Sequence, residues 1–109
     1  MFKVVRNAEF THDVLVVVPV DDGFEEHKLR TRFRSKTDEE LAAFDFQTRA
    51  GQDEFLRAVI VRFEDVIDET DAPLPMSDEL MDQMLATPNV RVALMAHYGE
   101  ARSKARLGN

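Results

Sequence analysis

Two patterns of hydrophobic and polar residues divide the chain. The run Val14–Val20 is rich in β-branched residues, which favour strands, and Asp21-Asp22-Gly23 after it is typical of a turn. The next segment, Phe24–Arg34, ends in a strict alternation of basic residues with leucine, threonine and phenylalanine, the period of a half-buried strand. The pattern predicts a β-hairpin within residues 1–36. Phe2–Arg6 is a candidate for a further short strand beside it.

Helical signals fill residues 37–109. Thr37 and Glu40 have the spacing of a capping box, which predicts a first helix ending near Gly51. A second helix is expected from about Gln52, because apolar residues recur at helical spacing as far as Phe63.

Two more helix starts follow a proline-rich turn. Pro73 and Pro75 fix an extended backbone and are expected to stop the second helix. Ser77 is the expected N-cap of a third helix with an acidic first turn. Thr87-Pro88 predicts a fourth helix, running to about Ala105. The expected fold is therefore α+β: an N-terminal hairpin or small sheet, then about four helices.

Composition bounds the class of protein. At 109 residues and 44% hydrophobic, the chain suits a single domain, residues 1–109, with a modest core. It contains no cysteine, which excludes disulfides, thiolate catalysis and cysteine-based zinc sites. The N-terminal residues do not resemble a signal peptide, and no apolar run is long enough to cross a membrane. We expect a soluble intracellular protein that does not bind membranes.

Charge is unevenly spread along a chain of net charge −7. Residues 37–90 hold three Lys/Arg against fourteen Asp/Glu, whereas residues 91–109 hold four against one. An acidic middle argues against binding to nucleic acid, whose affinity comes mainly from neutralised phosphates. The alternating Lys28, Arg30, Arg32 and Arg34 are expected on a solvated strand face, paired with an acidic helix face of the same or a neighbouring copy.

No pattern of catalytic or metal-ligating residues stands out. His12, His27 and His97 are too scattered to predict a metal site. The acidic run that begins at Asp68 fails as a calcium loop, because Pro73 occupies the place where glycine is needed. With no phosphate-binding glycine loop and no hydrolase motif, we expect neither an enzyme nor a cofactor or metal.

Methionines are concentrated near the third and fourth helices. Four of the five lie between Met76 and Met95, and Leu80, Met81, Met84 and Leu85 share one helical face. Methionine fills irregular gaps in cores, and it also lines grooves that accept varied apolar partners. The sequence leaves both interpretations open.

Several of these segments, in this order, resemble the tail assembly chaperones of long-tailed bacteriophages and prophages. The segments are Val16-Val-Val-Pro19 with Asp22-Gly23, Leu29-Arg-Thr-Arg-Phe33, Phe63-Glu-Asp-Val-Ile-Asp68, Pro73-Leu-Pro-Met-Ser-Asp-Glu-Leu80, Leu85-Ala-Thr-Pro-Asn-Val90 and Ala93-Leu-Met-Ala-His-Tyr98. The resemblance spans residues 12–109. The family usually carries glycine where Asp71 stands and tryptophan where Phe63 stands.

This resemblance implies a non-catalytic helper protein in the cytoplasm of the bacterial host, absent from the mature virion. It would bind the tape-measure protein and keep it soluble during tail morphogenesis, with the tail tube protein as a further partner. Separately, the hairpin edges and the broad apolar helical face of so small a domain predict that it forms homo-oligomers. The expected partner-binding residues are Phe63, Leu74, Met76, Leu80, Met81, Met84, Leu85 and Met95.

Two interpretations from other classes stay open. The chain is also compatible with a small acidic regulatory protein that mimics DNA, and with an accessory subunit of an enzyme or a small-molecule-binding domain. A closed pocket would favour the latter, and salt-dependent capture of DNA or a DNA-binding protein would favour the former.

Overall fold

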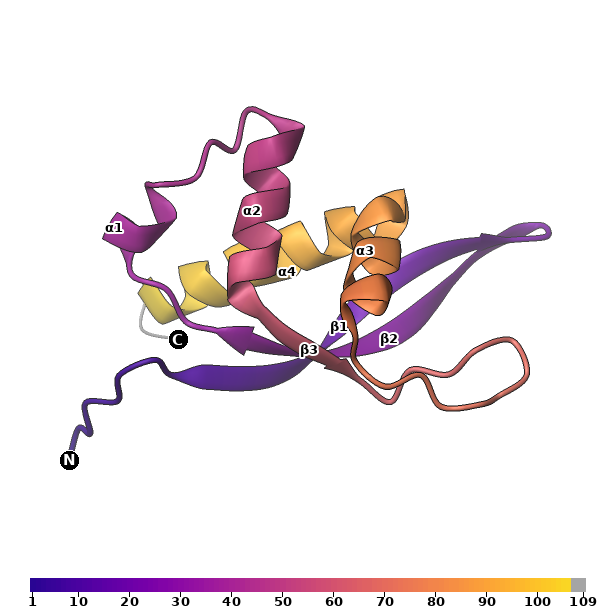
Figure 1. Ribbon diagram of the computed structural model, residues 1–109, viewed down its shortest axis with the longest axis horizontal. Coiled ribbons are helices and arrows are strands. Elements are labelled where there is room, and N and C mark those ends of the chain that lie inside the picture. The colour runs from indigo at the N-terminus through magenta and orange to yellow at the C-terminus, as the bar shows by residue number, and fades with distance from the viewer. Residues whose placement is uncertain (107–109) are drawn as a thin grey trace.

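The computed structural model of this chain describes residues 1–106; the last three residues of the expected domain, 107–109, lie outside the described residues. A three-stranded antiparallel sheet is combined with helices, so the expected α+β class is confirmed. The strands are β1 (Glu9–Val20), β2 (Gly23–Arg34) and β3 (Ile60–Glu64), and the helices are α1 (Asp38–Leu41), α2 (Arg49–Val59), α3 (Asp78–Ala86) and α4 (Pro88–Arg106). Figure 1 shows the larger helices gathered on one side of the sheet, while the hairpin projects at one end.

The predicted hairpin is present and long. β1 and β2 pair over their whole length, from Glu9 opposite Arg34 to Val20 opposite Gly23. Asp22 in the turn has a φ of 65°, a left-handed conformation that aspartate tolerates better than most residues. β2 is the central strand, because β3 pairs with its far side.

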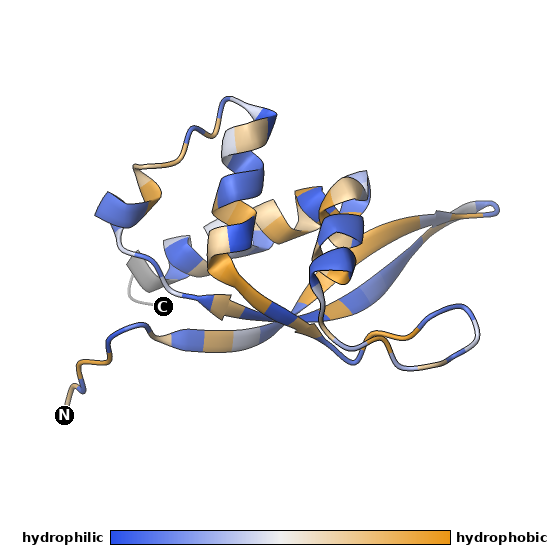
Figure 2. Ribbon diagram, in the orientation of Figure 1, coloured by the Kyte–Doolittle hydropathy of each residue, from blue (hydrophilic) through white to orange (hydrophobic). Residues whose placement is uncertain are grey.

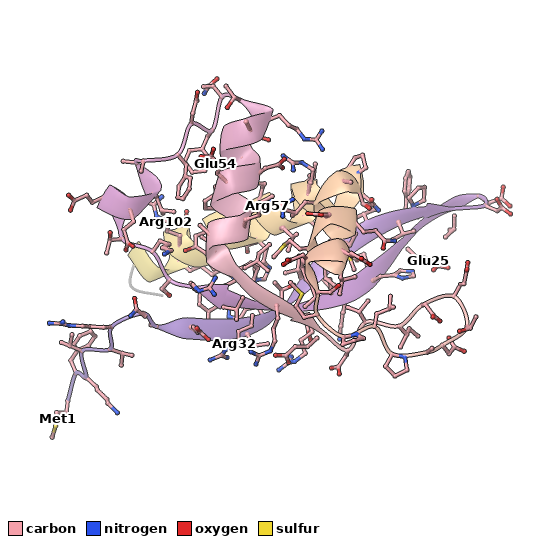
Figure 3. The ribbon with its side chains drawn as sticks, viewed as in Figure 1. Met1, Glu25, Arg32, Glu54, Arg57 and Arg102 are labelled. Atoms are coloured by element: carbon pink, nitrogen blue, oxygen red, sulfur yellow. The ribbon has the colours of Figure 1, made fainter. Side chains whose placement is uncertain are left out.

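The basic face of β2 is neutralised by acidic neighbours on both adjacent strands. Arg32 lies 2.8 Å from a Glu9 carboxylate oxygen on β1. Arg30 lies 3.3 Å from Asp13 on β1 and 3.7 Å from Glu64 on β3. Figure 3 shows Arg32 on the side of the sheet away from the helices. The expected pairing with an acidic helix face is therefore wrong: strands supply the carboxylates for Arg30 and Arg32. Arg34 instead donates to the carbonyls of Ala58 and Ile60.

The predicted second helix is wrong beyond Val59. The chain leaves the helix at Ile60 and forms β3, which pairs with β2 from Arg30 to Phe33. Val59, Ile60 and Phe63 are buried in this structure, and their spacing would also place them on one face of a helix. Helical spacing alone therefore could not distinguish a strand from a helix in this segment. Two causes favour the strand: the β-branched run at 59–61, and the open edge of β2, which offers backbone partners. The expected all-helical part, 37–109, thus contains a strand.

The predicted first helix is also too long. α1 ends at Leu41, after the Thr37–Glu40 capping box that the sequence predicted. Gly51 does not end a helix but lies inside α2, whose N-cap is Thr48. A Cβ on Gly51 would stand 1.9 Å from the carbonyl oxygen of Asp45, so this glycine allows the preceding loop to cross closely over α2.

Residues 1–8 form no strand in this chain. The candidate strand Phe2–Arg6 instead extends away from the body beyond the start of β1 (Figure 1). That part of the prediction is not confirmed.

The proline-rich turn has a different role from the one predicted. α2 has already ended at Val59, so the prolines do not stop it. Instead Pro73 pairs with Ile67, and the Leu74 N–H donates to the Val66 carbonyl at 2.7 Å, which folds the loop back on itself. Asp71, at the loop tip, has a φ of 63°, the conformation that glycine adopts freely.

Both later helix starts lie where the sequence placed them. The Ser77 hydroxyl accepts the Leu80 N–H at 3.0 Å and caps α3. α4 begins at Pro88, and the Thr87 carbonyl accepts the Arg91 N–H. The Thr87 hydroxyl, however, donates to the Gln83 carbonyl and so closes α3 instead of capping α4.

Candidate partner-binding surface

The eight residues expected to bind a partner fall into two groups. Phe63, Leu80, Met81 and Leu85 lie inside the hydrophobic core, with Met81 only 8% exposed. In this structure they pack β3 and α3 against the rest of the molecule.

The other four form the margin of that core. Leu74 and Met76 precede α3, Met84 lies on α3 and Met95 on α4, and all four are half-buried while packing against core residues. We call these four residues the methionine margin. Their outer atoms are accessible, and thioether side chains adapt to varied apolar shapes.

α4 extends this margin with an exposed apolar turn. Val92 is 69% exposed, although it is a large aliphatic residue, and Ala96 one turn later is also exposed. Residues three or four apart lie on the same helix surface, so Val92 lies beside both Met95 and Ala96. This surface offers apolar contacts and no charge of its own.

A buried arginine holds the helices behind this surface. Arg91 on α4 is 6% exposed. Its guanidinium forms an ion pair with Asp53 on α2, and it donates to the Gln52 side chain and to the Leu85 carbonyl on α3, each at 3.2 Å. A hydrogen bond to a charged group contributes about 1.5–3 kcal/mol, so Arg91 fixes the relative placement of three helices. Nothing in the sequence distinguished this arginine from a surface one.

A second, exposed ion pair joins α2 to α3. Arg57 donates to a carboxylate oxygen of Asp82 at 2.7 Å, with both side chains substantially exposed. Pairs of this kind contribute little to stability. Figure 3 shows Arg57 on the side of α2 that faces α3.

The acidic loop before α3 is organised by Asp68. Its carboxylate accepts from the Thr70 hydroxyl at 2.6 Å and from the backbone N–H groups of Thr70 and Ala72. These hydrogen bonds, the Thr70 hydroxyl first, lower the pKa of Asp68. The carboxylate therefore serves the loop's own backbone.

An aromatic cluster lies beside α4, where β1 begins and β2 ends. Tyr98 on α4 contacts the rings of Phe10, Phe33 and Phe55. Its hydroxyl donates to the Arg34 carbonyl at 2.9 Å and accepts the Lys36 N–H at 3.1 Å, while burial raises its pKa. Tyr98, the last residue of the Ala93–Tyr98 segment, therefore holds α4 against the end of β2.

Two histidines meet beside this cluster. His12 Nδ1 on β1 lies 2.8 Å from His97 Nε2 on α4, and the His97 ring stacks on Phe33. Burial, and then the neighbouring His12, lower the pKa of His97. Within residues 1–106, no three His, Asp or Glu side chains are grouped so that they could hold a metal ion.

The same end of the molecule carries an open hollow of about 290 Å³, lined by residues that include Phe10, Lys36, Tyr98 and Arg102. Pockets that bury a small molecule usually span about 300–1,000 Å³. Its cationic side chains are paired, Lys36 with Glu40 and Arg102 with Asp38. Tyr98 and His12 are engaged in contacts between β1, β2 and α4, so these lining groups already serve the fold.

Comparisons of this chain with protein-family models, with curated proteins and with solved structures found no match. Among the described helices, none combines the length and the apolar character needed to cross a membrane.

Proposed function

We propose that this protein is a tail assembly chaperone of a long-tailed phage or prophage, acting without catalysis on the tape-measure protein in the host cytoplasm. The observation that carries the proposal is the order of the motifs along one chain, from the Val16-Val-Val-Pro19 strand to the Ala93–Tyr98 helix. A long helical client, rich in apolar turns, would be shielded until tail tube proteins polymerise around it.

The surface chemistry supports this proposal. The methionine margin and Val92 give an accessible apolar surface on a protein of net charge −7. An apolar surface can accept one face of a client helix, while the acidic exterior keeps the complex soluble. Of the eight expected contact residues, the four of the methionine margin are the ones that a client could reach without unfolding the chaperone.

The test is a pull-down of the tape-measure protein encoded in the same genome, co-expressed with the chaperone. Val92→Glu places a charge on the proposed surface at a residue that is 69% exposed, so the variant is expected to fold. Client recovery should fall roughly tenfold or more, because docking would bury an unpaired carboxylate.

Gln83→Glu is the matched control. It adds the same charge at an exposed position of α3 outside the methionine margin, and recovery should equal that of the parent. Circular dichroism confirms folding of each variant before binding is scored. Equal recovery by Val92→Glu would remove this surface from the proposal. Capture of DNA or of a DNA-binding protein in place of the client would favour the DNA-mimic interpretation.

A further inference from the structure

The residues before β1 have the composition of a strand but form none, and the Ala8 carbonyl at their end accepts the Ser35 N–H at 2.8 Å. We call Met1–Ala8 the N-terminal arm. Phe2 is 90% exposed and Val4 is 79% exposed, and the arm carries Lys3 and Arg6 with no acidic residue. Figures 1 and 3 show it reaching away from the body, with Met1 at its tip. Apolar side chains held in solvent in this way mark an interaction segment.

The sheet offers a vacant place for such a strand. β3 pairs with β2 only from Arg30 to Phe33, so Gly23–Leu29 has β1 on one side and no strand on the other among the described residues. We call Gly23–Leu29 the distal edge of β2. Its unpaired backbone groups can form a ladder with an added strand.

The outer edge of β1 offers fewer free backbone groups to an added strand. Pro19 has no N–H to donate, and the Val17 carbonyl already accepts the Asn89 side-chain amide at 3.1 Å. These features leave fewer free backbone groups on the part of β1 beside the hairpin tip. The distal edge of β2 contains no proline, although the Leu29 carbonyl at its end accepts the Thr31 hydroxyl at 3.1 Å.

The hairpin tip is chemically complementary to the arm. Phe24 is 75% exposed, and Leu15 and Val17 are exposed on the same face of the sheet (Figure 2 shows hydrophobic residues continuing along the hairpin). Glu26 lies on the same face, opposite Val17, and Asp21 and Asp22 form the turn beside it, while Glu25 lies on the opposite face. An apolar, basic arm therefore matches an apolar, acidic tip.

The arm cannot reach the tip of its own chain. Arg6 precedes Glu9 by three residues, and an extended chain covers at most about 3.6 Å per residue, so Arg6 lies within about 11 Å of Glu9. Leu29, the nearest residue of the distal edge, pairs with Val14, which is five residues along β1 in the other direction, or about 17 Å. The vacant edge must be filled from another molecule.

We propose that the N-terminal arm of one copy adds as a strand to the distal edge of β2 in a second copy. Five residues, Phe2–Arg6, span about 17 Å, and the seven residues of the distal edge span about 23 Å, so the arm fits. With Phe2 and Val4 on the face of Phe24, strand alternation places Lys3 on the face of Glu25. The contact is heterologous, so it builds chains or rings of copies.

The test is sedimentation of the full chain over a rising concentration series. The parent should form species larger than a dimer. Phe2→Asp/Val4→Asp sets carboxylates of the arm against the acidic tip. Phe24→Ser removes the apolar tip contact without adding a charge that would attract the basic arm. All three positions are exposed, so the variants are expected to fold. Each variant alone should stay monomeric, with association weakened roughly tenfold or more.

Mixing the two variants separates this proposal from other modes of association. The tip variant keeps its arm and the arm variant keeps its tip, so the mixture should form a 1:1 dimer and grow no further. Val92→Glu, which tests the client surface, should associate like the parent, so the two proposals can fail independently. A parent that stays monomeric, arm variants that associate like the parent, or a mixture that fails to pair would each overturn the proposal.

Discussion

At the residue scale, the side chains that fix this fold are polar groups whose partners come from distant parts of the chain. The Tyr98 hydroxyl joins α4 to the end of β2, and the Arg91 guanidinium joins α4 to α2 and α3. The sequence assigned neither role, because a single tyrosine or arginine carries no local signal of burial. In contrast, Thr37 and Ser77 were predictable, since a cap acts within its own turn.

The contact between His12 and His97 predicts a dependence of stability on pH. Burial and His12 hold the pKa of His97 below its usual value of 6.5, so just below pH 6.5 the unfolded chain binds more protons at this site than the folded protein. The free energy of unfolding should therefore fall as pH drops through 6.5. Denaturant unfolding at pH 7.5 and 5.5 measures this change, above the range where Glu40 and Asp68 titrate.

His97→Gln supplies the comparison for that measurement. The glutamine amide does not titrate, so the variant should lose less stability between the two pH values than the parent does. Identical pH dependence in parent and variant would mean that His97 is not the group responsible.

At the scale of elements, periodicity predicted the hairpin and α3 but misassigned the segment after Val59. The apolar residues at 59, 60 and 63 are compatible with a helix and with a strand. The segment forms a strand because it pairs with the open edge of β2, which the sequence pattern does not reveal. Four of the eight residues expected to bind a partner lie in the core. The sequence could not distinguish these roles, because methionine and leucine at helical spacing are typical both of a core and of a partner-binding groove.

α3 gives a direct test of a helix start. Ser77→Ala removes the hydroxyl that accepts the Leu80 N–H and should cost about 1 kcal/mol of unfolding free energy. Ser103→Ala, at an exposed position of α4, is the matched control and should be close to neutral. If both substitutions had the same effect on denaturant midpoints, the hydroxyl of Ser77 would not stabilise α3.

At the scale of the whole molecule, a compact core is flanked by apolar surfaces that the single chain leaves uncovered. The methionine margin with Val92 lies on the helical side, and the arm and hairpin tip lie at opposite ends (Figure 1). If both proposals hold, these separate surfaces allow a client and a second copy to bind at the same time.

The most direct measurement is the fraction of tape-measure protein that stays soluble after expression with and without this chain. We expect the tape-measure protein from the same genome to aggregate alone and to stay in the soluble fraction with this chain, in a complex that co-purifies. A tape-measure protein that aggregates equally in both conditions, with this chain folded and abundant, would contradict the proposed function.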